Sequence, residues 1–301
     1  MSRFQLSQFH GVSPVLYAFW NVSGGLDHGA MRHQVERCIA AGAHGITVLG
    51  LITEINRMNR DERLELVRVV GAAVDGRVPY SVTIGEPDIA GQQRFISEAV
   101  QAGADWAILQ PPLVKGLPAE SISSFFEDVA SCSPVPVAIQ NNPVNLDVWL
   151  SNADLACLVE RAEAINLIKG EGSALQVGAL AGLLGGNVPI FAGQGGVEFP
   201  LELEGGCAGL IPAPELLDRQ VEIYETYRAG NVEQASRQHA EILPWIVMVT
   251  RTGIEGMLCY GKRLMARRIG LAEPTQRAPA LAPTTLGLRQ VDRMFDRLGP
   301  L

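Results

Sequence analysis

Eight short apolar runs recur along residues 1–230, and each is followed by a segment whose apolar residues have helical spacing. Buried parallel strands are apolar almost throughout because helices cover them, and these runs have that character. A weak internal repeat supports the pattern: "AAGAHGITVLG", "QAGADWAILQPP" and "GGCAGLIPAP" each place a glycine turn between a helix end and a strand. Eight strand and helix units, with no GxGxxG after the first strand, predict an α/β fold of the (β/α)8 TIM-barrel type rather than an open doubly wound sheet.

Residues 231–301 continue with three helical stretches, at 232–250, 254–270 and 285–298. We expect them to form a C-terminal helical extension packed on the barrel of residues 1–230, the two parts making one structural unit. A length of 301 residues is compatible with one domain, because α/β barrels routinely reach this size. Within the barrel, Asn59 and Glu62 have the spacing of a capping box at a helix start.

The charge pattern excludes several classes of partner. The formal net charge is −8 and there is no basic tract, so we expect no nucleic-acid partner, since phosphate binding needs clustered Lys and Arg. Arg263, Arg267 and Arg268 form the one arginine cluster, which we expect to be a solvated helix face. No apolar run approaches the length of a membrane span, and "MSRFQLSQFHG" lacks a leader pattern. The sequence therefore predicts a cytoplasmic protein with no membrane partner.

Neither the cysteines nor the histidines form a metal-binding pattern. The five cysteines are widely spaced and contain no CxxC pair, and the five histidines show no HExxH spacing. We therefore expect no disulfide framework, no metal and no cofactor.

Polar residues lie at the carboxyl ends of the predicted strands, where the active sites of barrel enzymes form. They are Thr53, Glu54, Thr83, Glu86, Gln110, Gln140, Asn141, Asn142, Lys169, Glu171 and Gln194. Lys169 is the one nucleophile among them, because the chain has no GxSxG, no cysteine at a strand end and no histidine placed to complete a triad. We expect Gln110 to contribute to substrate binding beside it.

Lys169 ends the apolar run of "INLIKGEG", and strand alternation places it on the same side as Glu171. An amine surrounded by apolar side chains loses solvation, which favours the neutral form that attacks a carbonyl, whereas a nearby carboxylate favours the charged form. Two interpretations stay open on the residues alone: a reactive amine with a proton-transfer partner, or a buried ion pair closing the barrel mouth. The other lysines, Lys115 in a Gly/Pro loop and Lys262 beside an arginine on a helix, suggest no special role.

These motifs resemble the dihydrodipicolinate synthase and N-acetylneuraminate lyase superfamily of Schiff-base barrels over nearly the whole chain. "LIKGEGS" is similar to the family's lysine strand, "GLITE" to its GTTGE loop, "NRDERLELV" to the helix that follows, and "GGCAGLIPA" to its glycine-rich strand eight. The resemblance implies that Lys169 forms an imine with a 2-keto acid. It also implies that the substrate is bound by the loop of Gly50, Leu51, Ile52, Thr53 and Glu54 and by Ile211, and that the protein is a homodimer or homotetramer.

The segment "IQNNP" departs from the family's YNxP, because Gln140 stands where a tyrosine relays protons. Asn145 stands where dihydrodipicolinate synthases have an arginine for their second substrate. Gln at the tyrosine position together with a KxE is similar to the 2-keto-3-deoxy-L-arabonate dehydratase branch. That resemblance implies that Glu171 transfers protons, while Gln140, Asn141 and Gln194 bind hydroxyls or an ordered water.

We therefore predict a Schiff-base lyase that dehydrates a 2-keto-3-deoxy sugar acid, with Lys169, Glu171 and Gln140 as its catalytic residues. One alternative is a carbon–carbon lyase or aldolase of the same superfamily, since cleavage uses the same enamine. Another is a keto-acid binding protein that has lost catalysis, suggested by the missing tyrosine and by the hydroxyl-poor "GLITE".

Overall fold

The computed structural model describes residues 3–112 and 114–301 and confirms the predicted barrel of parallel strands. The sheet has eight strands in the order β1-β8-β7-β6-β5-β4-β3-β2, and every pairing is parallel. An isolated parallel bridge from Val15 to Thr47 joins the segment after β1 to β2, which closes the sheet on itself. The strands are β1 Gly11–Val12, β2 Ile46–Val48, β3 Tyr80–Ile84, β4 Trp106–Leu109, β5 Val137–Asn141, β6 Ile165–Gly170, β7 Ile190–Ala192 and β8 Gly209–Leu210.

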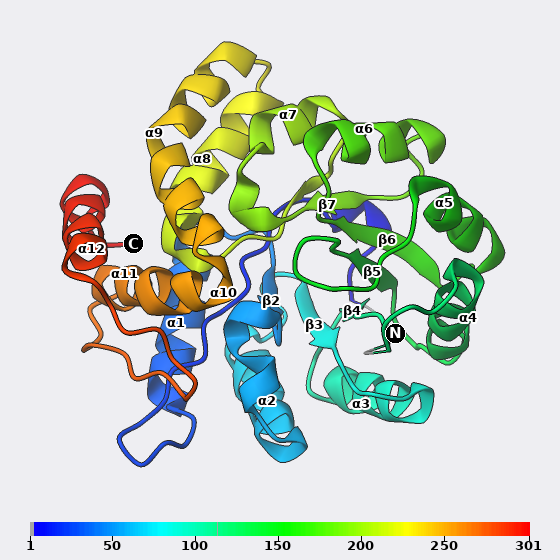
Figure 1. Cartoon of the computed structure of the whole chain (residues 1–301), viewed down its shortest axis with the longest axis horizontal. Helices are drawn as coiled ribbons and strands as arrows, with labels where there is room; N and C mark the ends of the chain where they lie inside the picture. Colours follow the sequence, from blue (N-terminus) through cyan, green and yellow to red (C-terminus); the bar gives the residue numbers. More distant parts are fainter. Residues whose placement is uncertain (1–2, 113) are drawn as a thin grey trace.

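Helices alternate with the strands and surround them (Figure 1). They are α1 His28–Ala40, α2 Arg60–Val74, α3 Ile89–Gln101, α4 Ala119–Ala130, α5 Asn152–Arg161, α6 Ala174–Leu183, α7 Phe199–Glu204 and α8 Leu217–Arg228. Asn59 caps α2 and forms the predicted capping box with Glu62. The box satisfies backbone N–H groups that have no partner inside the helix, which fixes where α2 begins after the β2 loop.

The first strand is shorter than its apolar run suggests. Regular pairing covers Gly11 and Val12, and the run continues as irregular extended chain. Pro14 lacks a backbone N–H, so it accepts a hydrogen bond from the Thr47 N–H without donating one, and the pairing with β2 is interrupted there. Leu16 then donates to the Thr47 carbonyl at 2.9 Å. Individual hydrogen bonds, rather than a regular ladder, therefore close the barrel between the segment after β1 and β2.

The C-terminal helices lie along one side of the barrel (Figure 1). They are α9 Val232–Arg251, α10 Gly253–Gly256, a π-helical turn at Met257–Gly261, α11 Lys262–Arg268 and α12 Thr285–Leu298. Helix α9 packs on α7 and α8, and α12 packs on α11. Among the residues described, none of these or the other helices is long and apolar enough to cross a membrane.

The arginine cluster of α11 is not the solvated face that the sequence suggested. Arg268 is 1% exposed, and its guanidinium donates to both oxygens of Asp218 at 2.8 Å and to the Glu215 carbonyl at 2.7 Å. Arg267 does remain exposed, pairing with Asp292. Arg268 therefore ties α11 to the start of α8 directly behind the carboxyl end of β8.

Candidate active site

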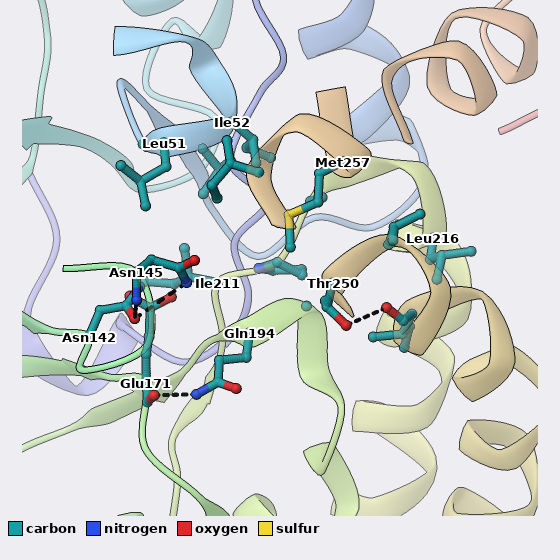
Figure 2. A pocket seen from close by; sticks show the side chains of 18 of the residues that line it. Leu51, Ile52, Asn142, Asn145, Glu171, Gln194, Ile211, Leu216, Thr250 and Met257 are labelled. Atoms are coloured by element: carbon teal, nitrogen blue, oxygen red, sulfur yellow. Dashed lines mark hydrogen bonds between the residues drawn. The ribbon is translucent and has the colours of Figure 1, made fainter. Parts of the chain in front are cut away.

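A pocket opens at the carboxyl ends of the strands, and the C-terminal helices form one of its walls. Leu51 and Ile52 face Glu171 and Gln194 across it, with Met257 and Thr250 along a third side (Figure 2). The lining from strand ends and their loops includes Val15, Gly50, Leu51, Ile52, Gln140, Asn142, Asn145, Lys169, Glu171, Gln194, Gly195 and Ile211. The lining from α9 and the segment that follows is mainly apolar: Trp245, Ile246, Val249, Thr250, Ile254 and Met257.

Lys169 and Glu171 point into this pocket together, as strand alternation predicted. The Lys169 Nζ lies 3.6 Å from the Glu171 Oε2, and each side chain is 7% exposed. Lys169 is paired in register with Gln140 on β5 and with Phe191 on β7, so its backbone is fixed from both sides. At 3.6 Å the amine and the carboxylate share no short hydrogen bond. The amine consequently keeps its donors available for a ligand in the pocket.

A chain of amide side chains holds Glu171 in place. Gln140 Nε2 donates to Glu171 Oε2 at 2.7 Å, and Gln110 Nε2 donates to Gln140 Oε1 at 3.2 Å. The Gln92 side chain donates to the backbone carbonyl of Gln110 at 3.4 Å. On the opposite side Gly193 is required, because a Cβ there would overlap the Glu171 side chain. Glu171 is thus restricted to a single position beside Lys169.

The turn after β7 is built from three consecutive residues with left-handed backbone. They are Gln194 at φ 50°, Gly195 at φ 69° and Gly196 at φ 79°. A left-handed conformation is strained for a residue with a side chain, and such strain is typical of functional positions. Gln194 uses this conformation to donate from its amide to the Glu171 carbonyl. The turn is held from behind by Gln220, which donates to Gly195 O at 2.9 Å, and by His239 Nε2, which lies 2.8 Å from Gly196 O.

The loop after β2 presents backbone rather than hydroxyls to the pocket. Leu49 has φ 60°, and Gly50 then precedes a short 3-10 turn at Leu51–Thr53. A Cβ at Gly50 would lie 2.8 Å from the Val15 side chain, so a glycine is needed for this approach. The first N–H groups of such a turn have no partner within it, so those of Leu51 and Ile52 can bind an anion. Gly50, Leu51 and Ile52 all line the pocket.

Four predicted substrate-binding residues lie outside the pocket lining and bind other protein groups instead. The Thr53 hydroxyl donates to Leu16 O at 2.8 Å, and Gln110 supports Gln140. Asn141 is turned away and exchanges two hydrogen bonds with the Leu150 backbone, at 2.8 and 3.0 Å. Glu54 is buried behind the loop, where it pairs with Lys262. Their placement supports roles in holding the loops and gives no direct contact with a ligand.

Lys262 is the largest departure from the sequence-based expectation. It is fully buried, and its Nζ donates to Glu54 Oε1 at 2.8 Å and to Thr275 O at 2.9 Å. Burial lowers its pKa below the usual value, and the neighbouring Glu54 carboxylate offsets part of that effect. Lys115, in contrast, has an exposed side chain that pairs with Asp147.

The far end of the pocket contains a buried carboxyl group, Glu215, which no sequence pattern singles out. Tyr17 donates its hydroxyl to Glu215 Oε2 at 3.0 Å, and Trp245 donates to Oε1 at 3.4 Å. Desolvation raises the pKa of Glu215, which favours its neutral form. Glu215 and Trp245 come from the β8–α8 loop and α9, which meet only in the folded chain. Among the residues described, no three His, Cys, Asp or Glu side chains are grouped to hold a metal ion.

The sequence model of the dihydrodipicolinate synthetase family matches residues 8–295 of this chain. A 4-hydroxy-tetrahydrodipicolinate synthase of Desulforamulus reducens is 27% identical over 206 residues, covering 67% of this chain and 69% of its own. A Coccidioides immitis protein, provisionally named a mitochondrial 4-hydroxy-2-oxoglutarate aldolase, is 28% identical over 238 residues, covering 75% and 74%.

A solved structure has the same fold over nearly the full length. YagE, a prophage protein of the dihydrodipicolinic acid synthase family from E. coli K12 crystallised with pyruvate, superimposes with a TM-score of 0.86 at 21% identity. The superposition covers 97% of this chain and 99% of that one.

Proposed function

The chain belongs to the dihydrodipicolinate synthetase family, and from that membership we propose that it is a lyase that binds a 2-keto acid as an imine on Lys169. The observation that carries the proposal is the placement of the Lys169 amine 3.6 Å from the Glu171 carboxylate in a pocket that otherwise offers mostly amides and apolar groups. An amine for covalent capture beside a fixed carboxylate for proton transfer is the combination that enamine chemistry requires.

In the proposed mechanism, the substrate carboxylate binds the backbone N–H groups of Leu51 and Ile52. The neutral Lys169 amine attacks the C2 carbonyl, and loss of water gives a protonated imine that acidifies C3. Glu171 removes the C3 proton, and the electron pair of that C–H bond forms the enamine. Gln140 donates to the same carboxylate and keeps it directed at the bound carbon chain.

We propose dehydration of a 2-keto-3-deoxy sugar acid as the specific reaction. The enamine expels the C4 hydroxyl, which takes the proton that Glu171 removed from C3 and leaves as water. Hydrolysis of the resulting conjugated imine frees Lys169. The amides of Gln140, Asn142, Asn145 and Gln194 support this proposal, because neutral amides suit a hydroxylated substrate. Similarity to the dehydratase branch at Gln140 and at the KxE of Lys169 and Glu171 supports it as well.

Carbon–carbon cleavage is the second candidate, favoured by the relative that is named as an aldolase. If the base removes the C4 hydroxyl proton instead, the C3–C4 bond breaks, giving an aldehyde and the enamine of pyruvate. The two reactions therefore differ in which proton Glu171 reaches, and their products identify them: one keto acid and water, or pyruvate and an aldehyde. A third outcome is binding of a keto acid without turnover.

Borohydride trapping tests the imine directly. The protein is incubated with pyruvate or with 2-keto-3-deoxy sugar acids, reduced, digested and analysed by mass spectrometry. We expect an adduct on the Lys169 peptide, none on the buried Lys262 peptide of the same sample, and none in Lys169→Ala. If a keto acid binds, as shown by calorimetry, and Lys169 stays unlabelled, the imine proposal is wrong. Product analysis of unreduced samples then separates dehydration from cleavage and from binding alone.

Assembly into a homodimer or homotetramer stays a proposal as well. Several large apolar side chains of the described surface are exposed, including Trp149 at 54%, Leu175 at 87% and Leu183 at 61%. Light scattering on the purified protein measures the oligomeric state, and a monomeric mass would contradict this proposal.

A further inference from the structure

Asn142 offers the pocket a hydrogen-bond donor. The side chain is 1% exposed and lines the pocket, and its Oδ1 accepts hydrogen bonds from the backbone N–H groups of Val144 at 3.2 Å and Asn145 at 2.9 Å. Because those two groups can only donate, the orientation of the amide is fixed. The Nδ2 is left buried with no partner among the described residues. This atom can only donate, so a group that pairs with it must be an acceptor.

Within the described residues, Gln220 has an unpaired hydrogen-bond acceptor, whereas Asn142 has an unpaired donor. Gln220 is 2% exposed, lines the same pocket, and donates from Nε2 to the Gly195 carbonyl at 2.9 Å. A carbonyl can only accept, so this amide orientation is fixed too, and the buried Oε1 has no partner in the described part of the chain. The Oε1 can only accept a hydrogen bond. A group that pairs with Gln220 Oε1 must therefore be a donor such as a hydroxyl, and a carboxylate or phosphate oxygen is unsuitable there.

Lys169 lies between these two amides around the barrel. Asn142 directly follows β5, Lys169 is on β6, and Gln220 reaches from α8 to the turn after β7. These strands are neighbours in the order β5, β6, β7 and β8. A carbon chain attached to Lys169 therefore has a donor on one side and an acceptor on the other.

The charges of the pocket limit the ligand further. Among the described residues that line it, Lys169 is the one positively charged side chain, and Glu171 and Glu215 are carboxyl groups. Imine formation uses the Lys169 amine, and the backbone N–H groups of Leu51 and Ile52 serve one carboxylate. A second acid group on the substrate would be desolvated beside two carboxyl groups without a cation, which is strongly unfavourable.

We propose that Gln220 and Asn142 select a 2-keto acid with a single carboxylate and a hydroxyl on the end of the chain beyond the reacting carbons, and that Gln220 is the residue that recognises that hydroxyl. This proposal rests on the imine at Lys169 for the position of the substrate. It extends the proposed function, because it states which end group the pocket accepts and which it rejects.

Three acids that react at the same carbons test the proposal. They share C1 to C4 with a C4 hydroxyl and end at C5 in a hydroxymethyl group (2-keto-3-deoxy-pentonate), a methyl group (4-hydroxy-2-ketopentanoate) or a carboxylate (4-hydroxy-2-oxoglutarate). We expect wild-type kcat/KM to favour the hydroxymethyl acid over the methyl acid by about 10- to 100-fold, because the latter leaves a buried acceptor unpaired. The dicarboxylate should be poorer still. Equal rates for the three acids, or a preference for the dicarboxylate, would overturn the proposal.

Variants distinguish recognition of the end group by Gln220 from the support that Gln220 gives to the turn after β7. Gln220→Met should reduce the preference for hydroxymethyl over methyl to within about threefold. His239→Ala loosens the same turn at Gly196 without lying in the pocket lining, and it should keep the wild-type ratio. Asn142→Asp keeps the acceptor for Val144 and Asn145 but replaces the free donor with an acceptor. It should lower kcat/KM for the hydroxymethyl acid at least about 10-fold.

Affinities measured by calorimetry accompany the rates, and borohydride trapping on Lys169 is run on each acid. Absence of an adduct would contradict the proposed function. The affinities for the three acids would still show whether Gln220 recognises the end group. An unchanged preference in Gln220→Met would overturn the Gln220 proposal, whatever the trapping result.

Discussion

The protein contains two buried Lys–Glu pairs, which differ in their separation along the chain, in the distance between their charged atoms and in their surroundings. Lys169 and Glu171 lie two residues apart on one strand end, with 3.6 Å between the charged atoms, and they line the pocket. Lys262 and Glu54 lie 208 residues apart at 2.8 Å and are both fully buried. Trp20 and Arg57 also donate to Glu54, at 3.1 and 3.2 Å. The second pair is enclosed by protein partners, whereas the first faces a space that a ligand can fill.

Because both lysines are buried and only Lys169 is proposed to form an imine, burial alone cannot be the criterion for a reactive lysine. Both amines are buried, but the Lys262 ammonium has a carboxylate and a carbonyl as fixed acceptors. Lys169 has Glu171 at a distance, and Glu171 itself accepts from Gln140. A reactive amine needs unoccupied space and a partner that can exchange protons, and a structural amine needs neither.

The largest expected effect comes from Lys169→Met. We expect catalytic turnover to fall at least about 1,000-fold, because covalent capture of the keto group is lost. Stability should change by less than about 1 kcal/mol, because Glu171 keeps its hydrogen bond to Gln140 and its contact with the pocket. Steady-state kinetics and urea unfolding measure the two quantities. A variant that loses stability in parallel with turnover would mean that this pair is structural like the other.

Glu171→Gln should give the next largest effect. Loss of the proton-transfer group should lower kcat by about 100- to 10,000-fold while the Lys169 imine still forms. The measurement pairs kcat with borohydride trapping of pyruvate. A variant that neither traps nor turns over would place Glu171 in imine formation instead of in the later proton transfer.

Lys262→Met should lower the stability of the fold and leave imine formation at Lys169 unchanged. Removing one partner leaves Glu54 buried with an incompletely neutralised charge, and we expect a loss of about 3 kcal/mol in the free energy of unfolding. The folded fraction should still trap pyruvate on Lys169. Chemical denaturation gives the first value and trapping per folded molecule the second. An unchanged unfolding midpoint would show that Arg57 alone neutralises Glu54.

The double variant Glu54→Gln with Lys262→Met sharpens the comparison. Removing both charges together should recover part of the loss seen in Lys262→Met, by about 1 to 2 kcal/mol, because no buried charge is left alone. The same pairing at the other site, Glu171→Gln with Lys169→Met, should recover no turnover. A double-mutant cycle on unfolding free energy and on kcat tests both statements.

The smallest effect is on pH dependence. Burial lowers the pKa of Lys262 below its usual 10.5, so the native state releases this proton at a lower pH than the unfolded state does. Between the two pKa values the unfolded state binds more protons, and the free energy of unfolding therefore rises with pH. Wild type should gain stability relative to Lys262→Met as the pH approaches 10.5. A difference that shrinks over this range would contradict the direction of the shift.

The sequence predicted the barrel because its signals are local. Apolar runs, glycine turns and the Asn59 and Glu62 capping box each depend on neighbouring residues, and alternation along β6 placed Lys169 beside Glu171. The irregular first strand could have been suspected from Pro14 alone. What local patterns could not reveal is the partner of Lys262, since Glu54 lies so far away in the chain.

The same limit applies to the pocket wall. Trp245, Val249 and Met257 follow helical spacing like any core residue, and only the packing of α9 and the next turn against the barrel brings them to the site. In the sequence, Gln220 resembles any polar residue of an amphipathic helix. Its amide orientation is fixed only in the folded chain, by the hydrogen bond to the Gly195 carbonyl. Amide orientation depends on such tertiary contacts, so the polarity of the pocket could not be derived from the sequence.

The loop that lines the pocket at Gly50–Ile52 is held in place by the end of the chain. Lys262 binds Glu54, Thr275 donates to Trp20 O across 255 residues, and Arg277 donates to Arg57 O across 220. During synthesis on the ribosome, β6, which carries Lys169, emerges before Lys262, Thr275 and Arg277, which make these contacts. A nascent or truncated chain that ends before Lys262 therefore contains Lys169 without these contacts to the loop at Gly50–Ile52. We expect the pocket loop to reach its final arrangement only after residues 262–277 have been synthesised.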